Sequence, residues 1–94
     1  MNTAYSKLTL RLVIYGRVQG VYYRESMRQH AQSLGVAGWV KNRSDGTVEA
    51  VVHGEPQIVD AIVRWAHRGS DHSHVERVEI QNDDGSYTSF EVIR

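Results

Sequence analysis

Hydrophobic and polar residues alternate near the start of the chain. In residues 8–15 (LTLRLVIY), three leucines and an isoleucine occupy every second position, the period of a strand with one buried face. From Tyr23 to Leu34 the spacing of apolar residues changes to four, four and three, which predicts a helix. Gly35 follows at a position where glycine commonly ends a helix.

The same two periods continue along the rest of the chain. Asp-Gly at 45–46 and Asp-Asp-Gly at 83–85 predict turns. A second helix is predicted to begin at Glu55-Pro56 and to end before Gly69, because proline is favoured in the first turn. Its apolar stripe is Ile58, Ala61, Ile62 and Trp65, and further strands are predicted over 36–41, 48–52, 75–81 and 87–93.

The predicted order is therefore β-α-β-β-α-β with one more strand at the C-terminal end. This order is typical of an α+β, ferredoxin-like split βαβ sandwich, with an antiparallel sheet and two helices on one face. With 94 residues and no linker, the chain is predicted to be a single domain, residues 1–94. Such a fold hosts many functions, so the function has to be inferred from a site.

Composition narrows the class of protein. Apolar residues make up 40% of the chain, enough for a core, and cysteine is absent, which excludes disulfides and thiolate chemistry. The sequence has no apolar run near the roughly 20 residues that span a bilayer. The N-terminus has no secretory signal, so a cytoplasmic protein without membrane association is expected.

The formal charge is zero, from 11 basic and 11 acidic residues, but it is unevenly distributed. Residues 1–43 carry seven basic residues against one acid, and residues 44–94 carry four against ten. Zero net charge disfavours nucleic acid as a partner. The basic half is nevertheless predicted to form a cationic pocket for one small anion. Arg17, Lys41 and Arg43 are predicted to contribute to this pocket.

The segment GRVQGVYYR (16–24) lies between the first strand and the first helix. Its two glycines permit a tight turn, and successive backbone N–H groups in such a turn form an anion site. Arg24 then falls in the first helical turn, where a cation opposes the helix dipole unless it binds an anion. The candidate backbone donors are those of Gly16, Arg17, Val18, Gln19, Gly20, Val21 and Tyr22.

Neither of the commoner phosphate-loop patterns, GxxxxGKS/T and GxGxxG, matches this segment. A plain strand-to-helix turn with a solvent-exposed Arg24 is the competing interpretation. Asn42, predicted at the end of a strand, has an amide that could hold a water while contacting a phosphoryl oxygen. The alternative is that Asn42 only caps the following turn.

Two segments carry a resemblance to a known family. IYGRVQGVYYR (14–24) and GWVKNRSDGTVEAVVHG (38–54) resemble the two signatures of the acylphosphatase family, and the likeness covers residues 8–93. The family usually has Phe or Met where this chain has Tyr23, which is expected to place a hydroxyl at the pocket edge or on the helix face. GSDHSH (69–74) also departs, because relatives tend to have Pro and Ala there.

The resemblance implies hydrolysis of the carboxyl–phosphate bond of small acyl phosphates, with no metal, cofactor or covalent intermediate. By the same resemblance, Arg24 binds the phosphate, Asn42 orients the attacking water, and the loop N–H groups surround the phosphate oxygens. Inorganic phosphate is then the product and a ligand of the same site. The chain is expected to be a monomer with no nucleic-acid or membrane partner.

Three alternatives stay open from the sequence. A non-catalytic RNA-binding module of the same fold would need aromatic residues in a central strand, and TVEAVVHG (47–54) has none. The chain would also look the same if it were an N-terminal module of a larger maturation protein. His72 and His74, after Asp71, could be interpreted as a metal site, but two histidines and one acid in a polar loop favour a solvated loop.

Overall fold

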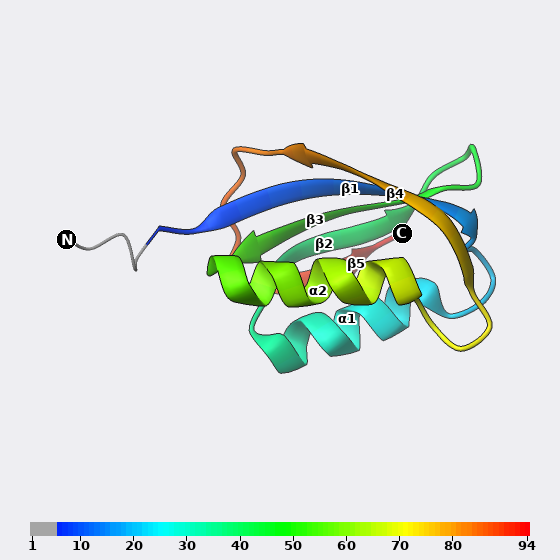
Figure 1. Ribbon diagram of the computed structural model, residues 1–94, viewed down its shortest axis with the longest axis horizontal. Helices are drawn as coiled ribbons and strands as arrows, with labels where there is room; N and C mark the ends of the chain where they lie inside the picture. The colour runs from blue at the N-terminus through cyan, green and yellow to red at the C-terminus, as the bar shows by residue number, and fades with distance from the viewer. Residues whose placement is uncertain (1–5) are drawn as a thin grey trace.

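A computed structural model describes residues 6–94 of the chain. Five strands form one sheet in the order β4-β1-β3-β2-β5, and both helices cover the same face of it (Figure 1). The elements are β1 (Leu8–Arg17), α1 (Tyr23–Leu34), β2 (Ala37–Asn42), β3 (Val48–Gly54), α2 (Pro56–Arg68), β4 (His74–Asn82) and β5 (Phe90–Ile93). The predicted α+β, ferredoxin-like order is confirmed. The predicted domain includes residues 1–5, which lie outside the described part, so its full extent stays a prediction.

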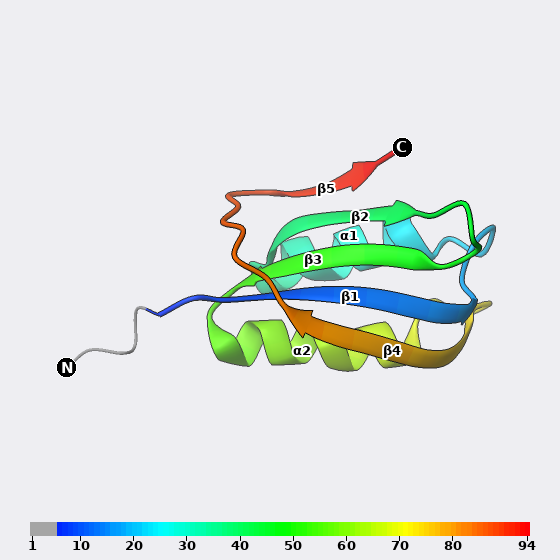
Figure 2. The same ribbon diagram turned by 90° about the horizontal axis from the view of Figure 1, so that it is seen from above.

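The last strand corrects the prediction of an antiparallel sheet. β5 pairs with β2 in parallel, from Gly38 beside Phe90 to Lys41 beside Ile93, whereas β1 to β4 pair antiparallel. Figure 2 shows the reason: after β4 the chain crosses to the other edge of the sheet at the end where β2 begins. β5 therefore runs in the direction of β2 and is shorter than the predicted strand over 87–93.

Gly16 sits at an irregularity near the end of β1, where the register with β4 shifts between Tyr15 and Gly16. Its φ of 129° lies in a region that disfavours other residues, and a Cβ there would collide with the backbone oxygen of His74. The strand continues to Arg17 beyond the predicted end, and the glycine lets β1 turn toward α1 while it remains paired.

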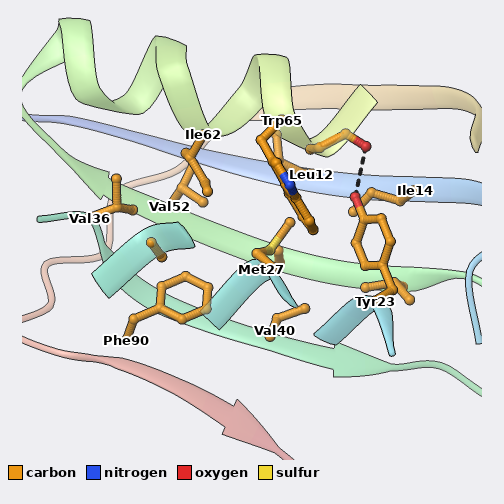
Figure 3. Close-up of a cluster of buried hydrophobic side chains, with 14 of the residues drawn as sticks. Leu12, Ile14, Tyr23, Met27, Val36, Val40, Val52, Ile62, Trp65 and Phe90 are labelled. Carbon is orange, nitrogen blue, oxygen red and sulfur yellow. Dashed lines mark hydrogen bonds between the residues drawn. The ribbon is translucent and has the colours of Figure 1, made fainter. Parts of the chain in front are cut away.

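The core lies between the sheet and the two helices (Figure 3). α1 buries the predicted stripe of Tyr23, Met27 and Ala31, and Gly35 ends it in the left-handed conformation, φ 83°. In α2 the buried stripe is rotated relative to the prediction, because Ile58 and Ala61 are only partly buried. The side chains that α2 does bury are Val59, Ile62, Trp65 and Ala66.

Tyr23 connects the two helices inside the core. It is 1% exposed, its ring centroid lies 5.2 Å from that of Trp65, and its hydroxyl donates a hydrogen bond of 2.8 Å to the carbonyl of Ala66 (Figure 3). Ala66 belongs to the last turn of α2, where carbonyls lack helical partners. The expectation of a hydroxyl at the pocket edge or on the helix face is therefore wrong, because the group points into the core to satisfy this carbonyl.

We expect Tyr23→Phe to lower the free energy of unfolding by about 1–2 kcal/mol, because it leaves a buried carbonyl without its donor. Tyr15→Phe is the matched control, since it removes an exposed hydroxyl that donates to Glu79, and its effect should stay within about 0.5 kcal/mol. Urea denaturation of the three proteins measures both changes. Equal stability of Tyr23→Phe and the wild type would contradict the role of this hydrogen bond.

The same substitution has a pH signature. Burial raises the pKa of the Tyr23 phenol, so the folded state keeps this proton at pH values where the unfolded chain loses it. Stability therefore decreases as the pH rises above about 10, the ordinary range for tyrosine. The Tyr23→Phe variant should show a weaker decrease over that range.

Candidate active site

A pocket of about 420 Å³ lies at the end of the sheet where β1 leads into α1 and where β2 ends. It brings together segments that are far apart in the sequence: the β1–α1 loop, the first turn of α1, the last residue of β2, and β5 with the residue that follows it. Its lining comprises Val18, Gly20, Tyr22, Tyr23, Arg24, Glu25, Asn42, Val92 and Arg94.

The backbone of the β1–α1 loop provides the donors of this pocket. Within residues 6–94, the N–H groups of residues 18–22 donate to no protein acceptor. Gly20 (φ 76°) and Tyr22 (φ 67°) both have left-handed backbone conformations. A run of unpaired N–H groups beside a helix N-terminus is an anion-binding arrangement.

The side chain of Gln19 fastens this loop to the β2–β3 turn. Its Nε2 donates to the carbonyl of Arg43 at 2.8 Å and to that of Thr47 at 2.9 Å. Both acceptors belong to the turn that follows Asn42, so Gln19 holds the loop and Asn42 in a fixed relation. Sequence analysis assigned only the backbone of Gln19, because its partners lie 24 and 28 residues away and no local pattern reveals them.

Asn42 is the last residue of β2 and pairs with Val48 of β3. Its Oδ1 is buried and has no hydrogen-bond partner in the described part of the chain. The following turn is capped instead by Asp45, whose Oδ1 accepts from the backbone N–H of Thr47 at 3.0 Å and from its hydroxyl at 2.6 Å. The interpretation of Asn42 as a turn cap is thus not supported, and its amide oxygen is available to a water.

Arg24 is the second residue of α1 and lines the pocket with its side chain partly buried. Among residues 6–94 its guanidinium forms neither an ion pair nor a side-chain hydrogen bond. The neighbouring acid, Glu25, is instead paired with Arg28, and this hydrogen bond lowers the pKa of Glu25. Arg24 is therefore a cation left for a ligand.

The other basic residues near the site do not have the predicted role. Lys41 pairs with Glu49 at 3.9 Å, Arg43 pairs with Asp45 at 3.4 Å, and neither lines the pocket. Arg17 is exposed and also lies outside the lining. Lys41 is neutralised because β3 lies beside β2, and Arg43 is neutralised by an acid of the turn between these strands. The second basic side chain of the pocket is Arg94, which sequence analysis did not predict.

Neither a metal site nor a membrane segment is found in the described residues. Between residues 6 and 94, no group of three or more His, Asp or Glu side chains is placed to hold a metal ion. Neither helix in this range is long and apolar enough to cross a membrane.

The family model described as Acylphosphatase matches residues 10–92. The chain belongs to the acylphosphatase family. Acylphosphatases of Thiobacillus denitrificans and Rubrobacter xylanophilus are 57% and 47% identical to it, over 88% and 98% of this chain and 93% and 86% of their own. An acylphosphatase structure from Coxiella burnetii has a TM-score of 0.91 at 33% identity, covering 99% of this chain and 100% of that one.

The family assignment confirms the resemblance inferred from the segments 14–24 and 38–54. It also favours the enzyme over the RNA-binding module of the same fold. These two segments contain Arg24, Asn42 and the loop, and one pocket is lined by Arg24, Asn42 and the loop residues Val18, Gly20 and Tyr22.

Gln19→Ala should lower the affinity for inorganic phosphate, because it releases the loop from the turn beside Asn42. It should also lower the free energy of unfolding by about 1–3 kcal/mol, because two side-chain hydrogen bonds are lost, although both carbonyls keep a backbone donor. Calorimetric titration with phosphate and urea denaturation measure the two effects. The control is Gln29→Ala on α1, where the amide makes only an exposed contact with Glu25; equal behaviour of the two variants would rule out the fastening role.

Proposed function

We propose that this acylphosphatase-family chain hydrolyses small acyl phosphates to a carboxylate and inorganic phosphate in the pocket beside the β1–α1 loop. The observation that carries the proposal is a set of unpaired groups at one place. It consists of the N–H groups of residues 18–22, the guanidinium of Arg24 and the buried Oδ1 of Asn42.

In this proposal the loop and Arg24 bind the phosphoryl group. The backbone N–H groups of residues 18–22 surround its oxygens, and the positive end of α1 adds a favourable field. The guanidinium of Arg24 offers two parallel N–H donors to a phosphate, a geometry that a lysine cannot provide. Bound phosphate also removes the unfavourable placement of a cation in the first turn of a helix.

Asn42 positions the water that attacks phosphorus. Its Oδ1 accepts a hydrogen bond from the water and so directs the water's lone pair toward the phosphoryl group. The water oxygen forms the new bond to phosphorus while the bond from phosphorus to the acyl oxygen breaks. The electron pair of the broken bond leaves on the carboxylate, and a water proton passes to a phosphoryl oxygen, giving dihydrogen phosphate.

The substrate itself accepts this proton in our proposal. Glu25 is the only carboxylate side chain in the described lining of the pocket, and its pairing with Arg28 lowers its pKa and makes it a poor base. A carboxylate is a good leaving group, so a strong general acid is not required either. Positioning and charge stabilisation then account for catalysis, as in other phosphoryl transfers.

The remaining features expected from the sequence stay predictions. They are a monomeric state, a cytoplasmic location, activity without metal or cofactor, and the absence of a nucleic-acid partner. Inorganic phosphate, as the product, is expected to bind the same loop and to compete with substrate.

Arg24→Ala should reduce kcat/KM for benzoyl phosphate by about 100-fold to 1,000-fold, because it removes the side-chain cation from the phosphoryl site. The control is Arg64→Ala, which removes an exposed arginine of α2 that pairs with Asp60 and lies outside the pocket. Steady-state hydrolysis, with circular dichroism to check folding, measures the effect. A folded Arg24→Ala variant with near wild-type turnover would exclude the assigned role.

Asn42→Ala should reduce kcat by about 100-fold or more while inorganic phosphate still binds with unchanged affinity, because the amide places water rather than substrate. Asn42→Asp keeps an acceptor but adds a negative charge, so it should weaken phosphate binding as well. Steady-state kinetics and calorimetric titration separate the two effects. An Asn42→Ala variant with weakened phosphate binding and normal kcat would refute the water-positioning role.

A further inference from the structure

A second pocket, of about 540 Å³, adjoins the first across Tyr22, which lines both. Tyr22 is 72% exposed and is held with φ 67° at the start of α1, a conformation that costs a non-glycine residue about 1–2 kcal/mol. The opposite walls come from the last turns of α2 and from the 69–72 segment. The hydroxyl of Ser70 donates to the carbonyl of Val21 at 2.8 Å and closes the gap between the two loops.

One of the two departures from the family signatures lies at this second pocket, and the other, Tyr23, lines the first. The unusual 69–74 segment supplies part of its wall. The unusual Tyr23 is anchored by its hydroxyl to Ala66, one residue from the pocket-lining Trp65. Arg24 and Asn42, in contrast, line only the first pocket. The departure at 69–74 therefore lies beside the pocket of the reacting group, on the side where we place the variable part of the substrate.

The geometry of the reaction directs the acyl group toward this side. In phosphoryl transfer the attacking and leaving oxygens lie roughly in line through phosphorus. Asn42 places the water at the end of β2, on one side of the β1–α1 loop, and the 69–72 segment lies on the other side of that loop (Figure 2). The leaving acyl oxygen therefore points away from β2, toward Tyr22 and the second pocket.

The lining has the chemistry to bind an anion. Of its five ionisable side chains, three are basic, Arg68, His30 and His72, and the other two are Asp71 and Tyr22. Arg68 has no ion-pair partner among residues 6–94. The ring of His30 stacks on that of Trp65 with centroids 4.9 Å apart, so the pocket also has a flat aromatic wall.

We propose that the second pocket receives the acyl part of the substrate and selects acyl groups that carry a carboxylate at the end away from the phosphate, with Arg68 as its partner. This inference rests on the proposed hydrolysis in the first pocket. Tyr22 forms the wall that the acyl group passes. Asp71 opposes the carboxylate, so Arg68 and Asp71 act with opposite signs on the same substrate.

The test compares two substrates with the same aromatic acyl core, benzoyl phosphate and 4-carboxybenzoyl phosphate. The quantity measured is the ratio of kcat/KM for the carboxylated substrate to that for benzoyl phosphate. Arg68→Gln should lower this ratio about threefold to fivefold, the size expected for a partly exposed ion pair. Asp71→Asn should raise it about twofold, because a repulsive charge of the same exposed kind is removed.

Arg64→Gln is the matched control, since it removes the same charge from the same helix at a residue outside the second pocket. Its ratio should equal that of the wild type. An unchanged ratio in Arg68→Gln, or an equal decrease in Arg64→Gln, would overturn the subsite. A ratio that Asp71→Asn lowers would overturn it as well.

The two proposals fail in different ways. If the wild type hydrolyses neither substrate, the proposed function is wrong and the subsite is rejected with it. If the wild type hydrolyses both and the Arg68→Gln ratio matches the wild type, only the subsite is rejected.

Discussion

Five consecutive backbone N–H groups, those of residues 18–22, have no acceptor in the described part of the protein. Backbone donors in folded proteins are nearly always paired with protein or water, so a run without a protein acceptor is free to bind a partner from outside. The surrounding structure keeps this run in place: the register shift at Gly16 turns the chain, left-handed conformations at Gly20 and Tyr22 shape the loop, and Gln19 ties it to the next hairpin. An anion is the partner that fits all of these features.

The rest of the fold determines which charged side chains near that loop are paired and which stay unpaired. The interleaved strands bring acids of β3 and its turn to the cations that flank Asn42, which neutralises Lys41 and Arg43. Glu25 likewise forms an ion pair with Arg28. Arg24 thus remains unpaired beside the loop within residues 6–94, so the pocket can hold a phosphoryl dianion although the whole chain has no net charge.

Much of the fold could be predicted because periodicity is a local property. Both helices and the first four strands lie within two residues of their predicted bounds, and Arg24, Asn42 and the loop meet as the family resemblance implies. What failed depends on contacts between distant segments. The pattern over 87–93 shows a strand but not which strand it joins, so the parallel pairing of β5 was not predictable. The amide of Gln19 is a further example, because its acceptors lie across the site.

The hydroxyl of Tyr23 is another group whose hydrogen-bond partner could not be predicted from the sequence. The helical stripe predicted that its ring is buried, but the acceptor, a carbonyl at the end of α2, is set by how the two helices pack. The second pocket likewise appears only when the ends of α1 and α2 meet the 69–72 segment. The position of a side chain is predictable from the sequence when its own segment determines that position. Contacts between distant segments are not predictable in this way.

The most direct test of the central claim is an NMR titration of the amide groups with inorganic phosphate, at constant ionic strength with chloride as the control anion. We predict that the N–H signals of residues 18–22 move downfield together and saturate with one dissociation constant, and that the Arg24 guanidinium signal moves with them. Saturating shifts confined to other amides, with the loop unchanged, would contradict the account.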